Sequence, residues 1–140
     1  MRILCLSSSP SSEQIAAFGE GYFCSQSFHV QPGTTYTVLG LTFYVRSQLY
    51  GTGVTAEIAD DDGHLVTVPL CLFEIVDGRA SRHWVVRAWD DGTTALWPAS
   101  FFSEFYRDDL SEGVSEATME YERVRGQIEA ETITPDLRLL

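Results

Sequence analysis

The sequence contains no lysine, and all nine of its basic residues are arginine. A Walker A phosphate-binding loop requires a lysine after its glycines. The stretch that comes nearest to such a loop, Gly51 to Ala56 (GTGVTA), lacks that lysine. A GxGxxG motif, which binds dinucleotides when it follows a strand, is also missing. The sequence therefore gives little support to nucleotide binding.

Cysteine is scarce as well. Cys5, Cys24 and Cys71 are odd in number and far apart, and none belongs to a CxxC pair, which argues against a disulfide framework and against a zinc site. His29 and His64 also lack metal-ligand spacing to a second histidine or to a cysteine. We therefore expect no metal and no cofactor, and a reduced cytoplasmic protein in which Cys5 and Cys71 are small buried thiols.

Long apolar runs are absent. No segment approaches the roughly 18 apolar residues that a membrane-spanning helix needs. The apolar run at residues 2–6 (RILCL) is too short for a secretory signal, whose hydrophobic region has about 7–15 residues. We expect neither a membrane span nor export by that route.

Basic residues are few in comparison with acidic ones. The sequence has 20 acidic residues against nine basic ones, which gives a formal net charge of -11. Such a surface repels nucleic acid and anionic membranes, so we expect neither as a partner. It attracts cationic partners and speeds their encounter. Net charge does not determine the fold, which must be inferred from the pattern of residues.

Alternating apolar and polar residues predict antiparallel strands. Every second residue from Leu39 to Val45 is apolar, which is typical of a half-buried strand. Residues 54–68 predict a hairpin whose loop is the three residues Asp61 to Gly63. That register places the apolar side chains on one face, because it pairs Ile58 with Val66, Ala56 with Val68, and Glu57 with Thr67.

Residues 72–97 predict further strands of the same sheet. If Asp77 to Arg82 is a loop, the strand at 72–76 pairs with the strand at 83–89. Phe73 and Ile75 would then share a face with Trp84, Val86 and Ala88, while Glu74, His83 and Arg87 would lie on the other. The turn at 90–92 (DDG) returns the chain in a strand at 94–97.

Helical patterns follow Pro98. Phe101, Phe102, Phe105 and Tyr106 are at helical spacing, and a second helix follows Gly113 with Ala117, Tyr121, Val124 and Ile128 on one face. We expect an α+β fold, namely an antiparallel β-meander or small SH3-like barrel of five to six strands followed by two C-terminal helices. The 140 residues are expected to form one domain, with an N-terminal arm or first layer (1–33), the sheet (34–98), two helices (99–130) and a tail (131–140).

His83 is the strongest candidate for catalysis. Glu74 or Asp77 could serve as its carboxylate partner. No nucleophile is evident beside the histidine, and no third group orients it. We therefore prefer to interpret it as part of an exposed polar cluster on the sheet, and we assign no catalytic residue.

Acidic and aromatic residues are the candidates for partner binding. The DDDG turn at 60–63 is not a calcium loop, because its acids are consecutive and Pro69 stands where an EF-hand requires glutamate. We expect the two acidic turns to project from one end of the sheet and to form an anionic lobe with the acids of residues 108–109. The predicted partner-binding residues are Asp60, Asp61, Asp62, Trp89, Asp90, Asp91, Asp108 and Asp109.

Three stretches carry a resemblance to a known group of proteins. They are PxxLFEIVDGR at 69–79, SRHW at 81–84 and FYRDDL at 105–110. Over residues 35–110 the chain resembles small bacterial proteins associated with the immunity proteins of polymorphic toxin systems. The resemblance implies that the protein binds a toxin domain and blocks it, and it implies no catalytic motif.

The favoured hypothesis is thus a non-catalytic cytoplasmic protein that neutralises a cognate toxin by stoichiometric occlusion of its active site. A cationic toxin domain would suit the charge. Two alternatives remain open. One is an enzyme that uses His83 with a nearby carboxylate. The other is a small-ligand or peptide-binding barrel whose groove is lined by Tyr36, Tyr44, Trp89 or Trp97.

Overall fold

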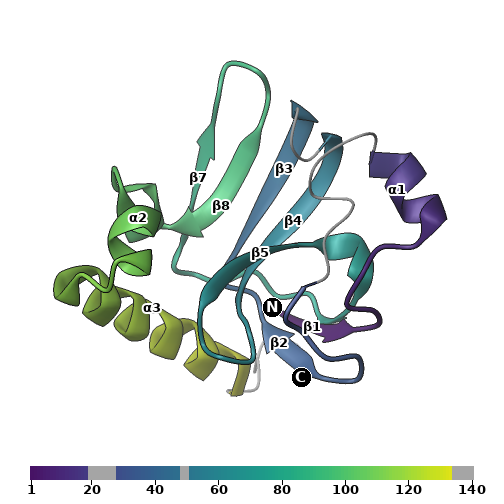
Figure 1. The fold of residues 1–140 in the computed structure, drawn as a ribbon. Helices are drawn as coiled ribbons and strands as arrows, with labels where there is room; N and C mark the ends of the chain where they lie inside the picture. Colours follow the sequence, from purple (N-terminus) through teal and green to yellow (C-terminus); the bar gives the residue numbers. More distant parts are fainter. Residues whose placement is uncertain (19–27, 48–50, 134–140) are drawn as a thin grey trace.

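The computed structural model describes residues 1–18, 28–47 and 51–133 (Figure 1). Its strands form two antiparallel sheets, with the orders β2-β1-β6 and β5-β4-β3-β8-β7. Helices follow the last strand, which confirms the predicted α+β class. The elements are β1 (Arg2–Cys5), α1 (Ser12–Phe18), β2 (Thr35–Thr37), β3 (Gly40–Ser47), β4 (Gly51–Ala59), β5 (Leu65–Pro69), η2 (Leu70–Leu72), β6 (Phe73–Asp77), β7 (Trp84–Ala88), β8 (Thr94–Pro98), η3 (Ala99–Phe102), α2 (Tyr106–Ser111) and α3 (Ser115–Ile133).

The strand predicted from Leu39 to Val45 is β3, and it is preceded by β2, which belongs to the other sheet. Val38 donates its backbone N–H to Met1 O, whereas Leu39 donates to Glu57 O. The chain therefore crosses from the small sheet to the large one between β2 and β3. β1, near the start of the sequence, is the central strand of the small sheet, because it lies between β2 and β6.

The hairpin of β4 and β5 has the predicted register. Ile58 lies opposite Val66, Ala56 opposite Val68, and Glu57 opposite Thr67. Gly63 has a φ of 83°, a conformation that glycine adopts without a steric penalty. The return of the chain after residues 90–92 is confirmed too, since β7 pairs with β8.

The predicted pairing of residues 72–76 with 83–89 is wrong. β6 pairs with β1, and β7 pairs with β8, so the two strands belong to different sheets. Period-two alternation shows only that a strand has two different faces, and many strands would satisfy it. The partner of β6 is about 70 positions away in sequence, where a local pattern gives no signal.

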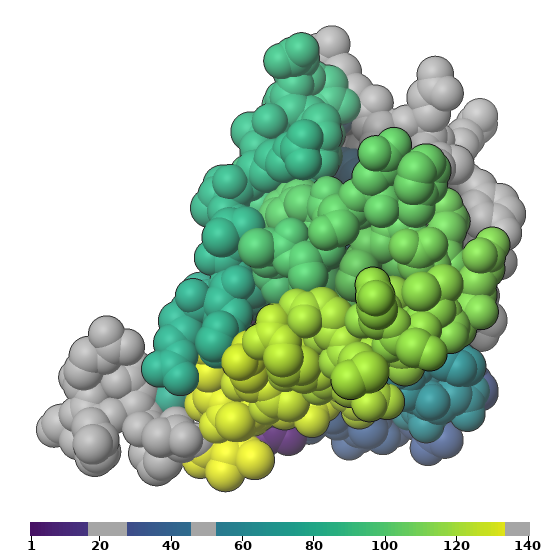
Figure 2. Space-filling view, turned by 90° about the vertical axis from the view of Figure 1, so that its left-hand side faces the viewer, coloured from purple at the N-terminus to yellow at the C-terminus, as the bar shows by residue number. Residues whose placement is uncertain are grey.

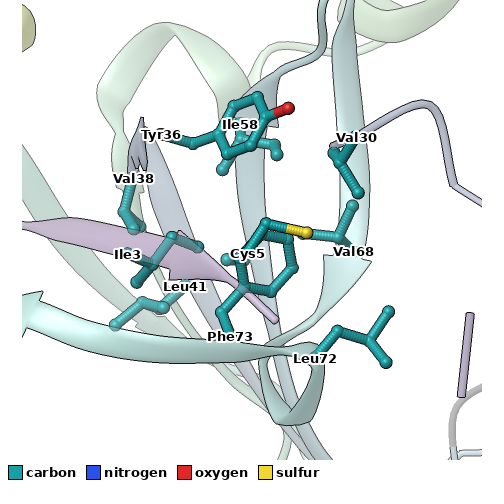
Figure 3. Close-up of a cluster of buried hydrophobic side chains, with 11 residues drawn as sticks. Ile3, Cys5, Val30, Tyr36, Val38, Leu41, Ile58, Val68, Leu72 and Phe73 are labelled. Carbon is teal, nitrogen blue, oxygen red and sulfur yellow. The ribbon is translucent and has the colours of Figure 1, made fainter. Parts of the chain in front are cut away.

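The core lies between the two sheets. Figure 3 shows side chains from both sheets converging on one cluster, with Tyr36 near one end and Leu72 near the other. Cys5 is part of this core, as expected. Cys71 is exposed, contrary to expectation, because η2 turns Leu72 inward and the preceding side chain outward. Cys24 lies outside the described residues.

The C-terminal helices cover the other face of the five-stranded sheet (Figure 2). Tyr121, Val124 and Ile128 of α3 are buried, as the sequence pattern predicts. The first predicted helix is divided into η3 and α2, because Phe105 adopts the left-handed region with a φ of 60°. A second cluster thereby forms between helices and sheet from Leu39, Phe101, Tyr106, Tyr121, Val124 and Ile128.

Candidate functional site

The acids of the β4–β5 turn are engaged in holding the turn and its surroundings. Asp60 Oδ1 accepts hydrogen bonds from the backbone N–H groups of Asp62 and His64, each at 2.9 Å. Asp61 Oδ1 accepts a 2.6 Å hydrogen bond from the Tyr36 hydroxyl. Asp62 Oδ2 lies 2.8 Å from His29 Nδ1. Asp60 therefore holds the turn itself, whereas Asp61 and Asp62 fasten the turn to β2 and to the segment before it.

The two acidic turns do not share one end of the sheet. Gly40 lies opposite Glu57, near the β4–β5 turn, whereas Phe43 lies opposite Thr94, where β8 begins. Because β3 connects these two positions, the turn at 89–93 lies at the far end (Figure 1). The expected anionic lobe is thus not formed, and its acids are divided among separate places.

Trp89 is the candidate with the most developed surroundings. Its ring lies 6.0 Å from that of Trp97 and 6.3 Å from that of Phe102, and the last two rings stack at 4.8 Å. The guanidinium of Arg87 lies 5.5 Å from the Trp89 ring and 5.7 Å from the Phe102 ring. Trp89 nevertheless remains 39% exposed. A packed, partly exposed aromatic side chain of this kind is suited to act as an anchor in a binding interface.

Two acids lie beside this aromatic group. Asp90 and Asp91 begin the turn after Trp89, and both are exposed. Asp91 Oδ1 accepts a 2.9 Å hydrogen bond from the Thr93 backbone N–H, which fixes the turn. We call Arg87, Trp89, Asp90, Asp91 and Phe102 the Trp89 surface. The sequence analysis did not assign Arg87 or Phe102 to a binding surface. Arg87 could have been assigned, because it is two residues from Trp89 and side chains at that spacing in a strand lie on the same face.

Asp108 and Asp109 are in the first turn of α2, which is a favourable place for acids near a helix N-terminus. Their neighbour Arg107, whose side chain is 47% exposed, makes an ion pair with Glu57, whose side chain is 1% exposed. Thr67 Oγ1 donates to Glu57 at 2.8 Å and accepts from Arg107 at 3.2 Å. Sequence reasoning missed this network, which fastens α2 to the face of the large sheet.

His83 is placed beside α3, where the carboxylate that it contacts belongs to Glu131 and not to the expected Glu74 or Asp77. Its Nε2 lies 3.3 Å from Glu131 Oε1, and Arg82 Nε approaches the same oxygen at 3.5 Å. Asp77 is instead held by Arg79 at 2.6 Å, which keeps the pKa of that carboxyl far below its usual range. His83 thus bridges the 78–83 loop to the end of the long helix.

Tyr36 is separated from the tryptophans with which it was expected to line a groove. Tyr36 is buried between the sheets, where it packs edge-on against Phe73 at 6.2 Å. Trp97 lies on the other face of the large sheet and donates a 3.0 Å hydrogen bond to Thr42 Oγ1. A groove that includes both Tyr36 and Trp97 is therefore not formed.

A pocket and a possible ligand cluster lie near the β4–β5 turn. The pocket has a volume of about 220 Å³, is half open, and is lined by residues that include Thr35, Asp60 and Arg125; His83 is not among them. His29, Asp60 and Asp62 bring three ligand atoms within 4.8 Å of one another. The side chains in this cluster already bind one another or the turn backbone, so the cluster is explained without an ion.

Comparison with known proteins finds no matching family model, no similar curated protein and no similar solved structure. Function must therefore be inferred from the surfaces described above. Within the described ranges, no helix combines the length and the apolar character needed to cross a bilayer.

Proposed function

We propose that this protein is a non-catalytic binding protein of the immunity type, which neutralises a cognate bacterial toxin in the cytoplasm. The Trp89 surface is the observation that carries the proposal. Tryptophan and arginine are the residues that most often dominate binding energy at protein interfaces. Here the Arg87 guanidinium lies over the Trp89 ring, which packs against Trp97 and Phe102 and is still partly open to solvent.

The charge of the chain supports a cationic partner. The net charge of -11 accelerates association with a positively charged domain, and it disfavours non-specific binding to nucleic acid. Asp90 and Asp91 place negative charge directly beside the aromatic anchor. In this proposal the acids steer the encounter, and Trp89 with Arg87 supplies the lasting contact.

The proposed mechanism is stoichiometric occlusion of the toxin's active site. It requires no chemistry from the inhibitor, which agrees with the resemblance of residues 35–110 to immunity proteins. The alternative of an enzyme that uses His83 has less support, because His83 and Glu131 have no nucleophile beside them among the contacts described. Small-ligand binding has less support as well, because the pocket described beside the β4–β5 turn is half open and does not include Trp89.

The test begins with a toxin domain encoded beside this protein. The two are co-expressed, and rescue of growth is measured together with 1:1 complex formation. Replacement of the anchor, W89A, should raise the dissociation rate by at least about tenfold. The D90N variant should mainly slow association at low salt. M119A and E116Q, which change an exposed apolar and an exposed acidic residue on α3, are the controls.

Rescue that depends on Trp89 but not on Met119 would support the proposal. Equal binding by W89A and M119A would exclude the Trp89 surface as the contact. Failure of the wild-type protein to protect against any such toxin would overturn the immunity function itself. Turnover of a metabolite that is lost in H83A would favour the enzyme instead.

A further inference from the structure

β7 is an edge strand with exposed apolar side chains on both faces. It is the last strand of the large sheet, so no described strand pairs with its outer edge. Val85 is 45% exposed and Val86 is 68% exposed, and successive strand residues point to opposite faces. In Figure 2 this strand runs along the left margin of the molecule. Edge strands of this kind are templates for further strand pairing.

Natural edge strands are usually protected, and β7 lacks the common protections. The chain has no lysine, and the only charged residue within β7 is Arg87. The strand contains no proline, and its pairing with β8 is regular from Trp84 to Ala88, without a bulge. Lysine, proline and bulges are the devices that prevent edge-to-edge association. Their absence leaves β7 able to accept another strand.

The hydrogen-bonding pattern shows which groups of β7 face outward. Trp89 N–H donates to Thr93 O, so residue 89 belongs to a hydrogen-bonded pair with β8. Because such pairs alternate along an antiparallel ladder, Val85 and Arg87 also direct their N–H and C=O groups toward β8. Val86 and Ala88 direct theirs outward. Pro98, which lacks an N–H, lies opposite Trp84, as this alternation requires.

The sequence of β7 fits an antiparallel copy of itself. With a two-fold axis at Val86, each valine 86 faces its symmetry mate, Trp84 faces Ala88, and Arg82 faces Asp90. In this register a large side chain faces a small one, and a positively charged side chain faces a negatively charged one. An axis at Val85 would place Arg87 opposite His83, and an axis at Arg87 would oppose two arginines. Of the three axes, only the one at Val86 avoids placing two basic side chains opposite each other.

We propose that a second copy of this chain binds at β7 and joins the two large sheets into one continuous sheet across a two-fold axis at Val86. About four main-chain hydrogen bonds would form, two between the Val86 residues and one from each Ala88 N–H to Trp84 O of the other copy. The Trp84 N–H contributes none, because it already donates to Ser81 O. Arg82 is free to turn toward the second copy, because its contact with Glu131 is long and its side chain is 82% exposed. The interface is isologous and closed, which limits assembly to a dimer.

The salt dependence of this dimer distinguishes it from a complex with a cationic partner. Two copies of charge -11 repel each other at long range, and salt screens that repulsion. Dimerisation should therefore strengthen by several-fold between about 50 mM and about 500 mM NaCl. Binding of a cationic protein would weaken over the same range.

Sedimentation velocity over a range of protein concentrations is the first test. Wild-type protein should show a dimer fraction that rises with concentration. V86K places two like charges across the axis and should raise the dimer dissociation constant by at least about tenfold. V76K is the matched control, because Val76 is 52% exposed on β6, the edge strand of the other sheet. It should dimerise as the wild type does.

The register is tested by charge exchange. R82D brings two carboxylates together at each end of the interface and should weaken the dimer, while R82D/D90R should restore it. A wild-type protein that stays monomeric at all concentrations would overturn the proposal. So would equal effects of V86K and V76K. A monomer whose toxin binding is lost in V86K would show that β7 receives a strand of the toxin instead of a second copy.

Discussion

The Tyr36 hydroxyl donates a 2.6 Å hydrogen bond to Asp61 Oδ1 and accepts one of 2.9 Å from the Gln31 backbone N–H. These bonds join β2, the segment before it and the β4–β5 turn at a single oxygen atom. Part of the acidic character of this turn therefore serves the fold, so replacing its three acids together would perturb structure as well as association.

Loss of this oxygen should destabilise the protein. Y36F leaves the Gln31 N–H and the Asp61 carboxylate without their partner, and we expect a loss of about 1–3 kcal/mol in the free energy of unfolding. Y106F is the matched control. The Tyr106 hydroxyl is buried, and the described part of the chain offers it no hydrogen-bond partner. Its removal should be neutral or stabilising. Chemical denaturation of both variants measures the difference, and equal losses would refute this account.

Alkaline pH should unfold the protein through its buried tyrosines. Burial raises the pKa of Tyr36, Tyr106 and Tyr121 from 10.0 to about 12. Because the folded-state pKa is the higher one, the stabilisation is complete below pH 10 and is lost as the pH rises toward 12. Phenolate absorbance of the folded protein should show tyrosines that titrate late. A titration in which every tyrosine ionises near pH 10 would exclude the effect.

The ion pair between Glu57 and Arg107 should be more sensitive to loss of one partner than to loss of both. R107M leaves the Glu57 carboxylate buried and unpaired, which should cost about 3 kcal/mol. E57M/R107M removes both charges and should cost less than R107M alone. Denaturation of the two variants decides the point. A double variant less stable than the single would mean that the pair itself is strongly stabilising.

Two glycines should respond in opposite ways to alanine. A Cβ at Gly40 would meet Trp97 Cδ1 at 2.7 Å and Leu96 O at 3.2 Å, so G40A should cost about 1–3 kcal/mol. Gly126 lies within α3, and a Cβ there would meet nothing within 4 Å. G126A should therefore stabilise the protein by about 0.5–1 kcal/mol. Thermal unfolding of both variants, with opposite shifts, is the expected result.

Local features of the fold could be predicted from the sequence. The pairing of Ile58 with Val66 follows from residues that are close together, because a short turn and a one-sided apolar pattern allow one register. The buried face of α3 follows from the spacing of Tyr121, Val124 and Ile128. These patterns involve residues that are close together in sequence, so they can be interpreted without knowledge of the rest of the chain.

Long-range relations could not be predicted. The pairing of β6 with β1 and the contact of Arg107 with Glu57 join residues that are far apart in sequence. For the candidate site, the residue types could be recognised in the sequence, but the sequence did not show which of these residues lie together. Trp89 was identified from its type, whereas its contacts with Arg87 and Phe102 depend on how β7, β8 and η3 meet. The separation of the two acidic turns likewise depends on strand order.

The position of β1 has a consequence for the order of folding. This strand is synthesised before β2 and β6, yet it lies between them, and its Ile3 pairs with Tyr36 on one side and with Ile75 on the other. On a ribosome the small sheet therefore cannot be completed until the chain has grown past β6, so β1 stays unpaired along one edge until then. Such distant pairing slows folding relative to hairpin formation. We expect the β4–β5 hairpin to form early and the inter-sheet core to close late.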